Sequence, residues 1–204
     1  VRIVIFSNPC NPTSRIITKE DIRKLINKTD ALVVLDEAYM DFAEDESLLG
    51  EFENYDNLII LKTCSKALGS AALRLGFAVA NKTLTNVIRA VKSPYNVNSV
   101  SQALGEVLFA HPDYIDNCIE TVVNSRKELY SRILEIKSDK VEKIYETHTN
   151  FVFLKAKNAK QVFEKMKENS IIIRNMGDYL RITAGTKYEN EKMLETFKKV
   201  LEEV

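Results

Sequence analysis

Three short apolar runs, each followed closely by a polar cluster, constrain the fold of this chain more than any other feature. The runs span residues 1–6, 31–35 and 58–61. The middle run is apolar without alternation, which is typical of a strand covered on both faces in a parallel sheet. In an open α/β sheet, ligands bind beyond the carboxyl ends of the strands, so we expect the polar clusters to converge there. The clusters contain Asn11, Asp36, Tyr39 and Lys66.

The rest of the chain shows further strand and helix patterns. About a dozen residues separate a strand expected at 75–80 from the run before it, barely enough for a parallel crossover, so we expect that strand to be antiparallel. A helix is expected to begin at Thr18, where Asp21 stands in the third position. Further helices are expected at 84–91, 100–109, 113–136 and 159–168, with a last one ending at 204. Further strands are expected at 151–154, 171–173 and 179–182.

The order and length of the expected strands and helices change within the long helix expected at 113–136. Before it, strands and helices indicate an α/β domain with a mostly parallel sheet and flanking helices, spanning residues 1–118. After it, short strands and two helices indicate a small α+β domain, spanning residues 119–204. The chain opens on a strand-like run without Met, which suggests that an N-terminal part of the protein is missing.

Bulk properties exclude several classes of function. Lys plus Arg and Asp plus Glu number 29 each, so there is no electrostatic case for binding nucleic acid or an acidic membrane. No apolar run approaches membrane-spanning length, and no signal peptide is visible. The three cysteines are odd in number and widely spaced, as in a cytoplasmic protein with reduced thiols. His111 and His148 lack partners at metal-ligand spacing, so no metal is expected.

The stretch from 63 to 76 carries the residues best suited to binding a phosphate. Thr63 and Ser65 supply hydroxyl donors directly after the third run, and Arg74 supplies a planar fork that matches phosphate oxygens. Lys66 lies among them, and a lysine in such a loop can form a Schiff base.

Five motifs together resemble the fold type I aminotransferases that use pyridoxal 5′-phosphate. The motifs are N-P-x-N-P-T at 8–13, D-E-A-Y at 36–39, T-x-S-K at 63–66, an arginine at 74 and L-R-I-T at 180–183. Each motif alone is weak, but their order and spacing are specific, and they extend over the whole chain.

The resemblance implies roles around the cofactor ring. Lys66 would form the Schiff base with the cofactor and later move a proton. Asp36 would pair with the pyridine nitrogen, so that the ring acts as an electron sink. Tyr39 and Asn11 would bond to the phenolic oxygen of the ring.

The resemblance also assigns the phosphate and the substrate. Thr63, Ser65 and Arg74 would hold the cofactor phosphate, and Arg181 would clamp the substrate α-carboxylate, a task for which lysine is a poor substitute. The partners would be small amino and keto acids, and the protein would be a cytoplasmic homodimer.

Within the family, the likeness is greatest to histidinol-phosphate aminotransferases. It rests on the loop P-Y-N-V-N-S before S-Q-A and on the arginines in I-I-I-R-N and Y-L-R-I-T. Such an enzyme exchanges an amino group between histidinol phosphate and 2-oxoglutarate, and Arg174 would then assist with the substrate phosphate. Ser14 and Ala72 stand where the family has glycine, so the local turns are expected to differ.

Other interpretations remain open. The same scaffold serves other aminotransferases and threonine-phosphate decarboxylases, and residues around the lysine do not separate them. A non-catalytic aminotransferase-like effector domain of a transcription regulator is an alternative of another class. Asp36 could also simply cap the turn that follows it, and Arg74 could be an ordinary surface arginine.

Overall fold

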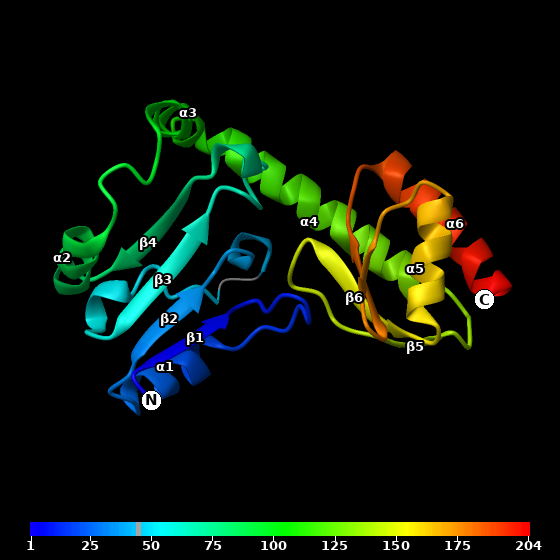
Figure 1. Cartoon of the computed structure of the whole chain (residues 1–204), viewed down its shortest axis with the longest axis horizontal. Helices are drawn as coiled ribbons and strands as arrows, with labels where there is room; N and C mark the ends of the chain where they lie inside the picture. Colours follow the sequence, from blue (N-terminus) through cyan, green and yellow to red (C-terminus); the bar gives the residue numbers. More distant parts are fainter. Residues whose placement is uncertain (44–45) are drawn as a thin grey trace. The chain divides into compact units, whose positions relative to one another are not determined.

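The computed structural model describes residues 1–43 and 46–204, which divide into two compact units (Figure 1). The first unit comprises Val1–Cys10 and Ile16–Ile119, and the second comprises Asn11–Arg15 and Glu120–Val204. The division lies inside helix α4 (Pro112–Leu134), one residue beyond the domain boundary expected from the sequence. Nothing in the sequence indicated that the short segment Asn11–Arg15 belongs with the second unit.

The first unit is built on a four-stranded sheet in the order β1-β2-β3-β4. Its strands are β1 (Ile3–Ser7), β2 (Leu32–Asp36), β3 (Leu58–Thr63) and β4 (Gly76–Ala80). The first three are parallel and β4 is antiparallel to β3, as the short connection predicted. The carboxyl ends of β1, β2 and β3 therefore lie at one edge of the sheet.

Helix α1 (Lys19–Asn27) covers this sheet with an apolar face. Thr18 begins the helix as predicted, because its hydroxyl accepts a hydrogen bond from the Asp21 N–H at 3.2 Å. The core of the unit is a cluster of seven buried residues from the helix, the sheet and one loop residue. The cluster contains Ile22, Ile26, Val33, Leu35, Leu48, Leu58 and Ile60.

Two further helices of the first unit begin at asparagine caps. Helix α2 (Lys82–Val91) begins after Asn81, and helix α3 (Ser99–Phe109) begins after Asn98. In each case the side-chain oxygen accepts a hydrogen bond from the third helical N–H at 2.9 Å. Gly105 of α3 lies so close to Leu75 that a Cβ there would meet the leucine side chain at 2.5 Å.

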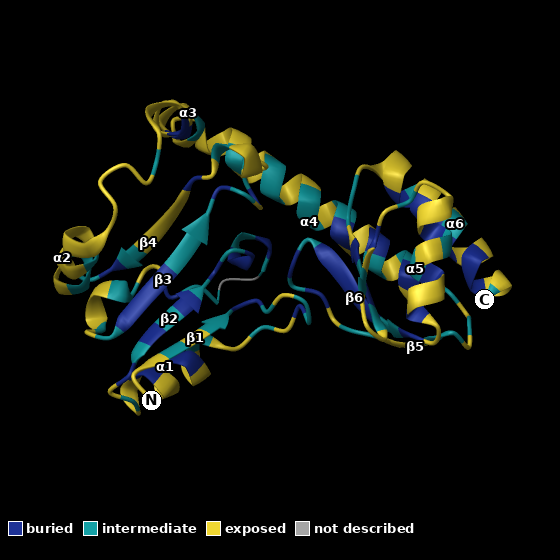
Figure 2. Ribbon diagram, in the orientation of Figure 1, coloured by how far each residue is buried: buried dark blue, intermediate teal, exposed yellow. Residues whose placement is uncertain are grey.

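The second unit is built on an antiparallel sheet in the order β5-β6-β8-β7. Its strands are β5 (Val141–Ile144), β6 (Phe151–Ala156), β7 (Arg174–Met176) and β8 (Tyr179–Thr183). Its core contains residues from helices α4, α5 (Ala159–Glu168) and α6 (Lys187–Glu203), and strand β6 is buried along most of its length (Figure 2). The α/β class with a small α+β second part is confirmed.

The strand expected at 171–173 is wrong. Ser170 has a φ of 61° and the Ile171 N–H bonds to Met166 O at 2.9 Å, so these residues close the end of α5. The strand β7 begins afterwards, at Arg174. The short strand β5 was not predicted, because its sequence V-E-K-I is half charged and gives only a weak pattern.

Ser14, at a position where glycine was expected, has a left-handed backbone conformation. Its φ is 58°, in the left-handed region that glycine favours. Ala72, the other such position, lies in a short 3₁₀ turn, Ala71–Leu73.

Within the described residues, we find no helix that combines the length and the apolar character needed to cross a membrane.

Candidate active site

The loop that carries Lys66 connects β3 to β4 and is closed at its base by paired residues. Thr63 is the register partner of Gly76, and the Cys64 N–H bonds to Leu75 O at 3.0 Å. A Cβ on Gly76 would lie 2.9 Å from the carbonyl oxygen of Lys62, so this close approach requires glycine. Cys64 is buried at the base of the loop, whereas Lys66 is exposed.

The amine of Lys66 lies over an aromatic residue from the neighbouring strand end. Its Nζ is 5.4 Å from the centroid of the Tyr39 ring, and Tyr39 is only 8% exposed. Asp36 ends β2 and accepts a hydrogen bond at Oδ1 from the Ala38 N–H at 3.0 Å. Asp36 therefore caps the turn that leads to Tyr39, the structural role weighed for it from the sequence.

The three phosphate-binding candidates share the Lys66 loop. Thr63 Oγ1 accepts a hydrogen bond from the Ser65 N–H at 3.1 Å, which fixes the first turn of the loop. Arg74 is exposed with a φ of 53°, and its Nη1 donates to Ala71 O at 3.0 Å. The structure thus brings together hydroxyl groups, a guanidinium and an exposed amine on one loop.

Glu37, next to Asp36, is a buried residue whose structural role was not recognised from the sequence. It is fully buried, and its carboxylate accepts hydrogen bonds from Ser47 Oγ at 2.6 Å and from the Leu48 N–H at 3.1 Å. Burial raises the pKa of Glu37, and the two hydrogen bonds act in the opposite direction. The only available signal was its place in D-E-A-Y, directly after Asp36.

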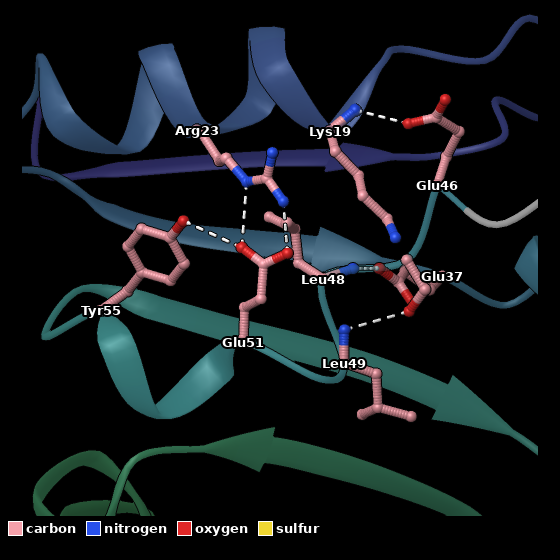
Figure 3. Close-up of polar contacts among 9 residues, drawn as sticks. Lys19, Arg23, Glu37, Glu46, Leu48, Leu49, Glu51 and Tyr55 are labelled. Atoms are coloured by element: carbon pink, nitrogen blue, oxygen red, sulfur yellow. Dashed lines mark hydrogen bonds and ion pairs between the residues drawn. The ribbon is translucent and has the colours of Figure 1, made fainter.

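A second set of polar contacts joins α1 to the loop before β3 (Figure 3). Arg23 forms a two-pronged ion pair with Glu51, and the Tyr55 hydroxyl reaches the same carboxylate at 3.4 Å. The guanidinium holds the pKa of Glu51 below its usual value. The Arg23–Glu51 ion pair and the hydrogen bonds of Glu37 both hold the loop that precedes β3. Strand β3 in turn leads into the Lys66 loop.

Asn8 organises the segment that follows β1. Its side chain is buried, with Nδ2 donating to Ile17 O at 2.9 Å and Oδ1 accepting from the Ile17 N–H at 2.7 Å. Its own N–H donates to Asp36 O at 2.9 Å. Asn8 therefore closes the base of the segment that contains Asn11.

In the second unit, Asn11 and Arg181 are direct partners. Arg181 Nη1 donates to Asn11 Oδ1 at 2.9 Å, and its Cζ lies 4.9 Å from the centroid of the Phe151 ring. The Nε of Arg181 is buried, and no described residue accepts a hydrogen bond from it. A planar cation held in this way is well suited to a carboxylate or a phosphate.

Arg174 lies opposite Arg181 across the β7–β8 pair. Directly opposed residues of antiparallel strands project from the same face, and like charges there are unfavourable unless an anion balances them. Arg174 is exposed. Two cations therefore lie opposite each other on this face of the second sheet.

In the part of the chain that the structure describes, no group of three or more His, Cys, Asp or Glu side chains is placed to hold a metal ion.

An apolar cavity of about 490 Å³ in the first unit is lined by Thr63 and Cys64 but not by Lys66, Asp36 or Tyr39. We therefore assign the candidate site to the Lys66 loop and not to this cavity.

Comparison with known proteins places these residues in a family. The sequence model of aminotransferase class I and II matches residues 1–197. The chain belongs to this family. Among the curated aminotransferase relatives, the histidinol-phosphate aminotransferase of Clostridium kluyveri is 41% identical over 98% of this chain and 58% of its own length. That of Clostridium novyi is 43% identical, over 97% of this chain and 56% of its own length.

Solved structures of the aminotransferase fold match the whole chain. The histidinol-phosphate aminotransferase of Clostridium acetobutylicum superposes with a TM-score of 0.91 at 23% identity, covering 100% of this chain and 65% of that one. The L-threonine-O-3-phosphate decarboxylase of Porphyromonas gingivalis gives 0.87 at 25% identity, covering 99% and 65%. The chain thus spans less than two thirds of the length of each of these relatives.

Proposed function

We propose that this chain is the part of a pyridoxal 5′-phosphate-dependent aminotransferase that carries the cofactor lysine, Lys66. The observation that carries the proposal is the Lys66 loop, where an exposed amine, two hydroxyl residues and Arg74 lie at the carboxyl edge of parallel strands. Their chemistry fits the cofactor, since hydroxyls and a guanidinium suit a phosphate and the Asp36 carboxylate suits a protonated pyridine nitrogen.

The cofactor, when bound, supplies an electron sink for the bonding electrons of the substrate α-carbon. Lys66 would attach it covalently and then move a proton to and from that carbon. Asp36 would hold the proton on the ring nitrogen, and Tyr39 and Asn11 would bond to the phenolic oxygen of the ring. Thr63, Ser65 and Arg74 would fix the phosphate.

For the substrates, we propose histidinol phosphate as amino donor and 2-oxoglutarate as acceptor, a reaction of histidine biosynthesis. The names of the two curated relatives from Clostridium kluyveri and Clostridium novyi support this choice. Arg181 would bind the α-carboxylate of 2-oxoglutarate, and Arg174 would assist with the phosphate of the donor. We further propose that the enzyme acts in the cytoplasm as a homodimer, which light scattering of the whole gene product would test.

The covalent role of Lys66 is tested by trapping with borohydride. The protein is incubated with pyridoxal 5′-phosphate, reduced and digested, and the modified lysine is located by mass spectrometry. We expect the label on Lys66, with Lys62 on β3 unlabelled as an internal reference because it is ion-paired with Asp41 at 2.5 Å. Lys66→Arg keeps the charge but lacks the primary amine, and should lose the label.

The trap is run on this chain and on the whole gene product, because the chain spans only 58% of the Clostridium kluyveri relative. Label scattered over surface lysines in both proteins would refute the proposal. Label on Lys66 in the whole gene product alone would show that residues beyond this chain complete the site.

The substrate choice is tested by a panel. Amino transfer from histidinol phosphate to 2-oxoglutarate should exceed both amino transfer from phenylalanine or tyrosine and decarboxylation of threonine phosphate. The decarboxylase alternative has a specific basis, the fold match at 25% identity. Arg181→Lys should lower kcat/KM for 2-oxoglutarate by roughly 10- to 100-fold, the equivalent of one lost hydrogen bond to a charged group.

A further inference from the structure

A buried group of hydroxyls in the second unit holds the segment that contains Asn11. Ser14 is 0% exposed, and its Oγ lies 2.8 Å from Thr149 Oγ1 and 3.3 Å from Thr147 Oγ1. The same oxygen accepts a hydrogen bond from the His148 N–H at 2.8 Å. We call Ser14, Thr147 and Thr149 the hydroxyl cluster.

The side chain of Ser14 is hydrogen-bonded, whereas its backbone has a conformation that is unfavourable for serine. A φ of 58° is unfavourable for a residue with a Cβ and natural for glycine. The buried hydroxyl would also be costly without partners, and it has three. The hydrogen bonds of the hydroxyl cluster therefore offset the strain of the turn.

The hydroxyl cluster reaches Arg181 along two routes. Through the backbone, Ser14 fixes the short segment whose Asn11 accepts the hydrogen bond from Arg181 Nη1 at 2.9 Å. Through Phe151, whose carbonyl oxygen accepts from Thr147 Oγ1 at 2.5 Å and Thr149 Oγ1 at 3.3 Å, it fixes the residue whose ring faces the guanidinium. Both groups that orient Arg181 are thus anchored to the same three hydroxyls.

A buried arginine supports the cluster from helix α4. Arg126 is 6% exposed, and its Nη1 donates a hydrogen bond to the carbonyl oxygen of Thr147. This contact fixes the backbone of Thr147, so the cluster is restrained by a helix as well as by the β5–β6 connection.

We propose that Ser14, Thr147 and Thr149 are positioning residues that hold the guanidinium of Arg181 for an α-carboxylate. This inference rests on the proposed function, which assigns the carboxylate to Arg181. The buried Nε of Arg181, which lacks a described acceptor, is the group that an incoming carboxylate oxygen would satisfy.

The test replaces Ser14 by glycine, which adopts the positive φ without strain and lacks the side chain that carries the hydroxyl. Ser170→Gly is a matched control, because Ser170 also has a positive φ, 61°, but is exposed. Thr149→Val should reproduce the effect of Ser14→Gly, and Thr149→Ser, which keeps a hydroxyl, should restore the original behaviour. The double variant Ser14→Gly/Thr149→Val should lose little more than either single variant, because each substitution already removes the hydrogen bond between Ser14 and Thr149.

The first readout needs no ligand. The Nε–H of Arg181, identified by its absence in Arg181→Lys, is followed by nitrogen-15 NMR with arginine labelling. Ser14→Gly should speed its hydrogen exchange by roughly tenfold, since the guanidinium is no longer held in its buried position. Exchange as slow as in the unmodified protein would overturn the proposal, and thermal unfolding curves of both serine variants confirm that each is folded.

The second readout uses 2-oxoglutarate as the probe on the cofactor-loaded gene product. Ser14→Gly should raise its Kd and KM by roughly three- to tenfold and leave kcat unchanged, because a carboxylate contact persists from ground state to transition state. A change in kcat with constant KM would refute positioning of the carboxylate clamp. If the unmodified product carries the Lys66 label yet binds no 2-oxoglutarate, the acceptor assignment has failed, and the exchange measurement alone still decides the role of Ser14.

Discussion

Glu37 is a buried residue that connects the end of β2 to a loop and to strand β3. Its two oxygens hold Ser47 and Leu48, and its backbone N–H donates to Leu61 O at 2.9 Å on β3. A carboxyl group in such a position is less costly when it is protonated, because burial penalises its charged form. The stability of the first unit should therefore depend on pH through this residue.

Glu37→Gln isolates this dependence. The folded chain binds the Glu37 proton more tightly than the unfolded chain, so its contribution to stability is full below the unfolded pKa and is lost as pH rises through the raised folded pKa. The free energy of unfolding of the original protein, measured with urea, should fall relative to that of Glu37→Gln as pH rises from 4.5. Parallel pH profiles for the two proteins would contradict this expectation.

At the level of single residues, sequence reasoning placed residues correctly where their position follows from a neighbouring strand. Lys66 and Arg74 could be placed on one loop because both follow the same apolar strand. Asn8 and Glu37 could not be assigned, because an asparagine or a glutamate has the same local appearance whether it is buried or exposed. Their roles depend on partners supplied by other segments of the fold.

Among the elements, helix α6 begins with a side-chain cap and packs one face into the core of the second unit. Thr186 and Glu189 form a reciprocal capping box, with the Glu189 N–H donating to Thr186 Oγ1 at 3.3 Å and the Thr186 N–H donating to Glu189 Oε2 at 2.7 Å. The helix then buries Leu194 and Phe197 in the core of the second unit.

Removing this cap should be measurable. Thr186→Ala should lower the free energy of unfolding by about 1 kcal/mol, because the Glu189 N–H in the first turn loses its acceptor, Thr186 Oγ1. Thr196→Ala on the same helix is the matched control, since its hydroxyl donates only to Lys192 O within the helix. Chemical denaturation of both variants provides the comparison, and equal losses would argue against a role of the cap.

Element prediction from sequence was accurate where the periodicity was strong. Helix α5 and the start of β6 were placed at their observed bounds. The isoleucines at 171–173 were misassigned because an apolar run can close a helix as readily as form a strand, and only the Ile171 hydrogen bond to Met166 distinguishes the two.

For the molecule as a whole, each unit has a core composed of its own residues. The first core contains Ile60 and Leu35, and the second contains Phe197 and Leu180. The attachment of Asn11–Arg15 to the second unit could not be predicted, because the partners of Ser14 lie more than 130 residues away in the sequence. A local pattern contains no information about such a pairing.

Separate cores should respond separately to damage. Ile60→Ala should lower the stability of the first unit by about 2–5 kcal/mol, because it leaves a cavity at a fully buried site. In native-state hydrogen exchange, protection of β2 and β3 amides should fall while that of β6 and β8 amides is retained. Leu180→Ala should give the reverse pattern, and a uniform loss across both sheets would contradict the expectation.

The antiparallel pairing of β4 with β3 restricts how the Lys66 loop can change in length. Thr63 and Gly76 close the loop, and in the strand that follows Phe77 and Val79 lie on one face and Ala78 lies on the other. If a single residue were inserted or deleted between them and the change passed into β4, every side chain of that strand would turn to the opposite face. Insertions and deletions here should therefore be absorbed inside the loop or come in pairs, whereas substitutions are unrestricted by register.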